Sequence, residues 1–158
     1  ARGGYDVSGK SELLLVEPYC LVYKELVPPE SLVKVPFIKY QTDASVANII
    51  ETWCAEHFDE PPSVAMDVNS MSTCRHFVRA GLGWSILTYM GLGSCKDKDI
   101  YVSPLRSKDG EYITRDTNMV FTKDAENLVV VKTFIEYVRN YYKEHTVVDD
   151  SIFREYKA

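Results

Sequence analysis

The alternation of apolar and polar residues is most informative over residues 63–87, where it predicts a strand, a helix and a second strand. Apolar and β-branched residues dominate 63–68, which is typical of a buried strand. Apolar side chains then recur at the three- and four-residue spacing of one helix face: Met71, Cys74, Phe77 and Val78. Residues 84–87 are apolar again. So compact a strand–helix–strand unit predicts parallel strands with a right-handed crossover.

Short polar residues and glycines mark the two ends of this predicted helix. Asn69 and Ser70 carry side chains that can accept hydrogen bonds from the first-turn amides. Gly81 and Gly83 follow the last turn, where a residue with positive φ is needed and glycine pays no steric penalty. Asn69 and Ser70 can be interpreted as helix caps and nothing more. They can also form a ligand site, because first-turn amides and the helix dipole attract anions.

A second helix with the same kind of start is predicted upstream. Residues 37–40 form a strand, and Gln41–Ser45 then opens a helix with Thr42 or Asp43 as its N-cap. Its apolar stripe, which runs to about Phe58, is Val46, Ile49, Ile50, Trp53 and Cys54. Because the carboxyl ends of parallel strands share one sheet edge, the two helix starts can converge. The predicted ligand-binding residues are Thr42, Asp43, Ala44, Ser45, Asn69, Ser70 and Met71.

The flanking segments add strands and one long helix. Residues 13–16 and 19–23 are strand-like, and Glu17-Pro18 between them suggests a bend, bulge or edge, since proline lacks a ladder donor. Asp109-Gly110 is the strongest hairpin signal in the chain. The longest helix is predicted to start within 123–127. Its apolar stripe is Leu128, Val131, Phe134, Ile135, Val138, Tyr141 and Tyr142.

Composition narrows the class of protein. A chain of 158 residues fits one domain, or one lobe and part of another. Its net charge of −5 gives no overall electrostatic grip on DNA phosphates. No apolar run is long enough to cross a membrane, and no signal peptide is present, so no membrane partner is expected. The cysteines show no dense disulfide pattern, which predicts reduced thiols and a cytoplasmic protein: Cys20, Cys54, Cys74 and Cys95.

Two cysteine–histidine pairs raise the question of a zinc site or a thiol nucleophile. Cys54-Ala-Glu-His57 and Cys74-Arg-His76 contain suitable ligand types, but their spacing does not match a zinc finger. Residues two apart on a helix also face different sides. Both cysteines lie on apolar helix stripes, where a thiol behaves as a small hydrophobic group. We therefore predict no metal, no cofactor and no catalytic residue.

The central stretch resembles the effector-binding domain of LysR-type transcriptional regulators. The family has a polar strand end, a helix that closes in a V-x-x-G-x-G turn and an apolar strand, as in Asp67–Leu87 here. Residues 14–23 and 35–40 are similar to the family's domain-crossing strand and the strand after it, and the resemblance covers roughly 12–144. Thr88 departs from the family, which commonly has proline after the apolar strand.

This resemblance implies a three-layer α/β sandwich of the type-II periplasmic-binding-protein style. It implies that this chain corresponds to the second of the family's two regulatory subdomains, together with the strand and helix that return to the first. The implied role is to sense a small, anionic metabolite, with homo-oligomers and DNA contact only through a part absent from this chain. A ligand that bridges two subdomains would act by raising the population of the arrangement that it binds more tightly. The alternative is a solute-binding or enzyme lobe of the same architecture, because fold alone does not decide function.

The resemblance also suggests where the parts of the chain begin and end. Residues 1–12 are expected to be a linker or an expression stub, and 13–122 the effector-binding lobe. Residues 123–145 would be the returning C-terminal helix, followed by a tail at 146–158. The apolar stripe of that helix normally packs on the first subdomain, so here it is expected to expose apolar surface or to find another partner.

Overall fold

The computed structural model describes residues 9–93, 99–145 and 148–154, and the chain divides into two compact units. Unit 1 combines Ala1–Glu17 with Thr114–Asp149, and unit 2 combines Pro18–Ile113 with Asp150–Ala158. The polypeptide therefore passes between the units at three points along the sequence. Among the described residues, no helix has both the length and the apolar character needed to span a membrane.

The strands of unit 2 lie in the order β3-β2-β4-β1-β5, as a β2-β3 pair and a β4-β1-β5 ladder that one isolated bridge joins into a continuous layer. Strand β1 (Lys10–Tyr23) pairs antiparallel with β4 (Ser85–Thr88) and with β5 (Tyr101–Pro104). Strand β2 (Phe37–Tyr40) pairs parallel with β3 (Val64–Val68). A parallel bridge between Phe37 and Trp84 joins β2 to β4, where Ile38 N donates to Trp84 O at 2.9 Å. The predicted parallel strands are confirmed, with β2 lying between β3 and β4.

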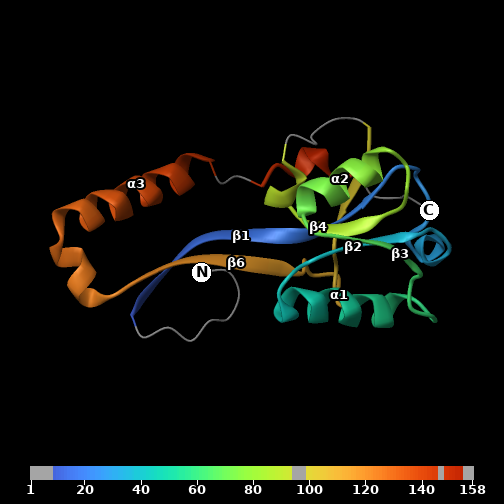
Figure 1. Ribbon diagram of the computed structural model, residues 1–158, viewed down its shortest axis with the longest axis horizontal. Helices are drawn as coiled ribbons and strands as arrows, with labels where there is room; N and C mark the ends of the chain where they lie inside the picture. The colour runs from blue at the N-terminus through green and yellow to red at the C-terminus, as the bar shows by residue number, and fades with distance from the viewer. Residues whose placement is uncertain (1–8, 94–98, 146–147, 155–158) are drawn as a thin grey trace. The chain divides into compact units, whose positions relative to one another are not determined.

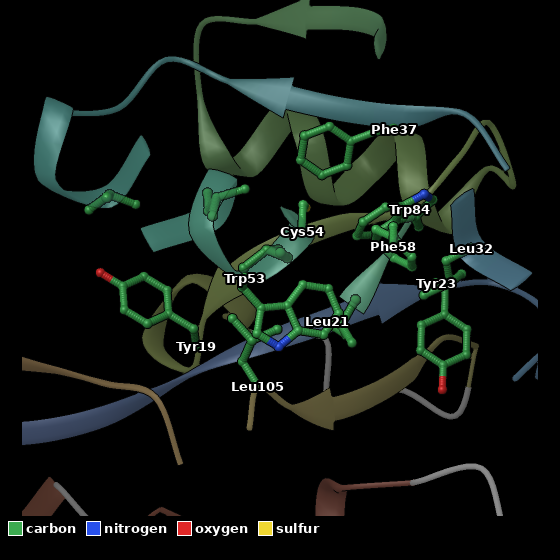
Figure 2. Packing of buried hydrophobic residues seen from close by; sticks show 13 residues of the cluster. Tyr19, Leu21, Tyr23, Leu32, Phe37, Trp53, Cys54, Phe58, Trp84 and Leu105 are labelled. Carbon is green, nitrogen blue, oxygen red and sulfur yellow. The ribbon is translucent and has the colours of Figure 1, made fainter. Parts of the chain in front are cut away.

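Two helices cover opposite faces of this sheet (Figure 1). Helix α1 (Ala44–His57) and alternate residues of β1 form one core cluster, and helix α2 (Met71–Arg79) covers the cluster on the other face. Figure 2 shows the α1-side cluster, in which the fully buried Trp84 ring lies 4.7 Å from that of Phe37. Trp84 Nε1 donates to Val35 O at 3.0 Å. The predicted three-layer α/β arrangement is therefore present in unit 2.

Strand β3 does not have the buried position that its apolar sequence predicted. In the described part of the chain it pairs only with β2, and Val64 is 53% exposed. Met66 and Val68 pack against the α2-side cluster, so one face of the strand is partly covered. A short apolar run is equally compatible with a central or an edge position, which is why the prediction failed.

The predicted interruption at Glu17-Pro18 does not divide β1, which is continuous from Lys10 to Tyr23. Pro18 instead lies where β1 changes partners. Before it, β1 pairs with β6 (Thr114–Phe121) of unit 1; after it, the ladders to β4 and β5 begin. Strand β1 therefore continues through a residue that cannot donate to a ladder.

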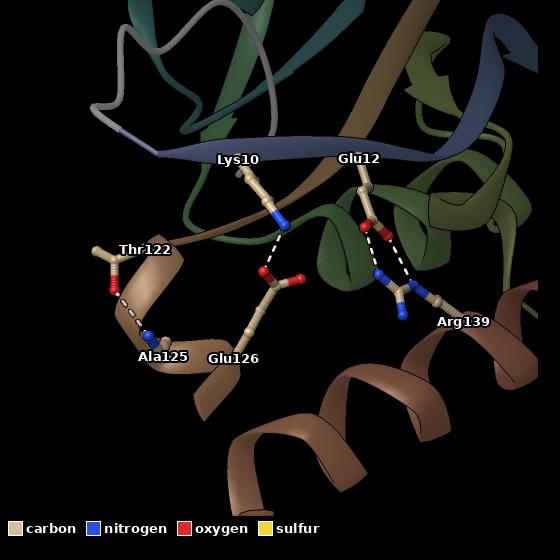
Figure 3. Close-up of polar contacts among 6 residues, drawn as sticks. All are labelled: Lys10, Glu12, Thr122, Ala125, Glu126 and Arg139. Carbon is tan, nitrogen blue, oxygen red and sulfur yellow. Dashed lines mark hydrogen bonds and ion pairs between the residues drawn. The ribbon is translucent and has the colours of Figure 1, made fainter. Parts of the chain in front are cut away.

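Unit 1 also differs from the sequence prediction at the start of its helix. Thr122 caps a short 3₁₀ turn, η3 (Lys123–Asn127), by accepting from Ala125 N at 3.3 Å (Figure 3). Leu128 is extended, with φ −87° and ψ 120°, and it separates η3 from helix α3 (Val129–His145). The single long helix predicted from 123–127 is thus two elements. Of its predicted stripe only Ile135 is fully buried among the described residues.

Charged pairs join β1 to the helical part of unit 1. Figure 3 shows Lys10 paired with Glu126, and Glu12 accepting from Arg139, whose Nε lies 2.8 Å from Glu12 Oε2. The Arg139 hydrogen bond holds the pKa of Glu12 below its ordinary value. The stabilisation from this pair is therefore present above the ordinary pKa and is lost as pH falls through the lowered one.

Candidate ligand-binding site

The start of α2 has the cap that the sequence predicted. Ser70 is the N-cap, and its Oγ accepts from Thr73 N at 3.1 Å and lies 2.9 Å from Thr73 Oγ1. This bond satisfies one first-turn donor. Within the described residues, the amides of Met71 and Ser72 have no hydrogen-bond partner. They are the donors that a bound anion could use.

Of the two residues considered for the cap of α1, Asp43 takes that position. Its Oδ1 accepts from Val46 N at 3.0 Å, and the helix begins at Ala44. The amides of Ala44 and Ser45 have no partner among the residues that the structure describes. Thr42 precedes the cap and is exposed. Each helix start is thus capped by one of the residues that the sequence offered for that position.

The two helix starts lie at one edge of the sheet, on opposite faces. Tyr40 and Val68 are register partners at the ends of β2 and β3, and Gln41 N donates to Val68 O at 2.9 Å. Thr42–Ser45 and Asn69 are exposed at this edge, while Ser70 and Met71 are half-buried. We call these residues, 42–45 and 69–71, the helix-start rim.

Electrostatics distinguish the two halves of the helix-start rim. The positive end of the α1 dipole already faces the Asp43 carboxylate that caps it. The α2 start has a neutral serine cap instead. Asp67 precedes it on β3, but its register partner on β2 is the cation Lys39. The α2 start is therefore the better half of the rim for an anion.

Contacts behind the rim fix the position of Met71. A Cβ built on Gly91 would lie 1.8 Å from Met71 Sδ, so the thioether occupies the space that glycine leaves. Thr88 Oγ1 accepts from Gly91 N at 3.2 Å and lies 3.9 Å from the same sulfur. One turn along α2, Arg75 Nη1 donates to the carbonyls of Gly91 and Leu92 at 3.2 and 3.1 Å. The sequence did not predict these supports, although Thr88 stood out by replacing proline.

A separate cavity of about 340 Å³ lies between α1 and strands β2 and β3. Its walls are largely apolar, with charged side chains among them. The walls include Phe37, Lys39, Thr42, Ile50, Glu51, Cys54, Phe58, Asp59, Glu60, Pro62 and Val64. Only Thr42 belongs both to this cavity and to the rim, so the cavity is a neighbouring feature that the sequence did not indicate.

The cysteines of the described chain are not arranged for catalysis. Cys20, Cys54 and Cys74 are buried thiols without a disulfide bond, and Cys95 lies outside the described residues. Burial, with a smaller effect of Glu51, raises the pKa of Cys54 to about 11, and burial also raises the pKa of Cys74. Protonated thiols are poor nucleophiles and poor metal ligands. Across 9–93, 99–145 and 148–154, no group of three His, Cys, Asp or Glu side chains is placed to hold a metal.

Comparison with known proteins places this geometry in a family. Residues 9–143 match the model of the LysR substrate binding domain. The chain is 33% identical over 138 residues to YraN, an uncharacterised HTH-type transcriptional regulator of Bacillus subtilis. The aligned region covers 87% of this chain. The chain spans about half the length of the curated relatives it matches, 47% of YraN.

Solved structures agree on the fold. The regulatory domain of CcmR from Synechocystis, in complex with 2-PG, superposes with a TM-score of 0.65 at 15% identity, covering 91% of this chain and 72% of that one. The effector binding domain of QuiR, in complex with shikimate, gives 0.59 at 15% identity, covering 87% and 68%. The fold is therefore the periplasmic-binding-protein-like α/β fold of LysR regulatory domains. The chain belongs to the LysR substrate binding domain family, the non-enzymatic regulatory part of LysR-type transcriptional regulators.

Proposed function

We propose that unit 2 binds a small anionic metabolite at the helix-start rim, and that binding sets the regulatory state of a longer LysR-type protein. The observation that carries this proposal is the pair of helix starts tied together by the Gln41–Val68 hydrogen bond. The α2 start adds unpartnered amides at Met71 and Ser72 within the described residues. The ligands in the CcmR and QuiR structures support a small molecule as the occupant of such a domain.

The roles of the rim residues follow from their chemistry. Main-chain N–H groups of α2 would hold the anion, helped by the helix dipole. The hydroxyl groups of Thr42 and Ser45 would donate from the α1 side, and Met71 would contribute apolar contact. A ligand that also touches another subdomain would favour one arrangement in proportion to its differential affinity. That shift would be transmitted to a DNA-binding region outside this chain.

The proposal predicts two effects of Ser70→Ala. Losing the N-cap hydrogen bond should lower the free energy of unfolding by about 1 kcal/mol. The variant should also bind anions more weakly, because the α2 start frays and its amides are no longer held in place. Urea unfolding measures the first effect. Titration with sulfate, shikimate and a panel of other carboxylates, followed by amide NMR shifts, measures the second.

Ser72→Ala is the matched control, because it removes an exposed hydroxyl from the same turn and keeps the main-chain amide. It should match the wild type in stability and in affinity. Shifts that concentrate at Ala44, Ser45, Met71 and Ser72 support the rim. Saturable shifts elsewhere in unit 2, with these four amides unmoved, would disprove the proposed site.

We further propose that the regulator self-associates and reaches DNA only through segments outside this chain. Helix α3 supports the first part, because its apolar face is uncovered: Val129 is 80%, Val130 81% and Phe134 62% exposed. Apolar patches of this kind usually mark an interaction surface.

We also propose a cytoplasmic location for the regulator. The three buried cysteines without disulfides support it, because thiols stay reduced in that compartment.

Sedimentation velocity tests the self-association. The wild-type chain should show a sedimentation coefficient that rises with concentration. Val130→Asp with Phe134→Asp should reduce that rise, because two charges would then have to be buried in the interface. Lys132→Asp, on an exposed position of the same helix, controls for added charge. A monomer at every concentration would contradict the proposal.

A further inference from the structure

The C-terminal segment returns to unit 2 after α3. Helix α3 ends at His145 in unit 1, and the turn η4 (Asp150–Ile152) already belongs to unit 2. This is a third covalent connection, in addition to Glu17/Pro18 and Ile113/Thr114. Four residues separate His145 from Asp150, so their Cα atoms can be at most about 17 Å apart.

Tyr89 and Tyr112 of unit 2 form an aromatic socket that receives this segment. The Phe153 ring lies edge-on to two tyrosines, with centroids 6.2 Å from Tyr89 and 6.3 Å from Tyr112. The Arg106 guanidinium stacks over the Tyr112 ring, 4.6 Å from the ring centroid. Edge-to-face rings at this separation attract one another, and a stacked guanidinium holds its ring in place. Phe153 is therefore an anchored side chain, although it lies close to the end of the described chain.

Backbone and aliphatic contacts complete the docking. Arg154 N donates to Val102 O at 2.7 Å, which extends the β5 edge of the sheet by one hydrogen bond. Ile152 packs with Phe153 against the α2-side cluster, and both are half-buried. Phe153 N donates to Asp150 O at 3.1 Å, which closes the turn that presents the ring. An aromatic anchor, an apolar neighbour and a sheet-edge hydrogen bond together define a docking site.

We propose that residues 150–154 form a tether: their docking in the Tyr89–Tyr112 socket limits how far unit 1 can move relative to unit 2. A chain that crosses only at the β1 and β6 connections can hinge about them. With the tether docked, the end of α3 must stay within the reach of the four-residue linker. Larger rearrangements require Phe153 to leave its socket, so the docking equilibrium and the arrangement of the units are linked.

Hydrogen exchange of the 158-residue chain tests the tether without any ligand. In the wild type, the segment around Arg154 should be protected. Phe153→Ala should speed exchange there and at the crossover segments 15–19 and 111–116 by about tenfold, the order expected for losing aromatic contacts of this kind. Exchange within α1, at 46–54, should not change. Phe153→Leu, which keeps an apolar side chain, should fall between the two.

Tyr137→Ala is the control, because it removes a 65% exposed aromatic ring from α3 rather than from the socket. It should leave the crossover exchange unchanged. Three results would each overturn the tether. The first is a wild-type tail that exchanges freely, and the second is a Phe153→Ala variant with a freed tail but unchanged crossovers. The third is tail protection that rises with protein concentration, since it would place the tail in the socket of a second copy.

Discussion

Arg115→Ala should lower the free energy of unfolding by about 3 to 5 kcal/mol, the range for removing one partner of a buried ion pair. The Glu17 side chain is fully buried, and Arg115 Nη2 and Nε lie 2.5 and 3.2 Å from its Oε1. Removing the guanidinium would take away the positive charge that contacts this buried carboxylate. Denaturant unfolding followed by circular dichroism measures the change.

Arg139→Ala is the matched control in the same unit. Arg139 also contacts a glutamate, Glu12, through Nε and Nη2, but both side chains are about one third exposed. Water screens such a pair, so its loss should cost much less than the loss of the buried Glu17 pair. Equal effects of the two substitutions would show that burial does not set the strength of the Glu17 pair.

Features decided by neighbours in sequence could be predicted, and features decided by distant contacts could not. Asp43 and Ser70 were among the predicted cap candidates, because a cap bonds to an amide three residues away. The edge position of β3 and the continuity of β1 through Pro18 depend on which strands lie alongside, and the local pattern does not contain that information. Leu128 is a local case that the sequence still missed, since its extended backbone has no distinctive residue type.

The same distinction applies to the sites. The helix-start rim could be proposed from sequence, because two strand–helix junctions in one parallel sheet must share an edge. Its supports could not, since Arg75 meets the Gly91 and Leu92 carbonyls only after the chain has turned back. The tether socket brings together Tyr89, Tyr112 and Phe153 from three separate segments. No spacing rule connects those residues.

Gly83→Ala should destabilise the protein by about 3 kcal/mol, the upper end for forcing an extra group into a packed site. A Cβ on Gly83 would lie 2.3 Å from Pro36 O, which is main chain and cannot rotate away. That carbonyl also accepts from Trp84 N at 3.0 Å, so relieving the clash would disturb the bridge between β2 and β4. Exchange at the Ile38 and Trp84 amides should therefore accelerate along with the loss of stability.

Gly81→Ala separates this close approach from the effect of backbone conformation. Gly81 has φ +77° at the end of α2, but a Cβ there would meet only Lys24 Cγ at 3.8 Å. Its substitution should cost about 1 to 2 kcal/mol, the strain of a left-handed non-glycine residue. The Ile38 and Trp84 amides should keep their wild-type protection relative to the rest of the sheet. If Gly81→Ala exposed those two amides as much as Gly83→Ala does, the Pro36 contact would not be the reason that glycine is needed at residue 83.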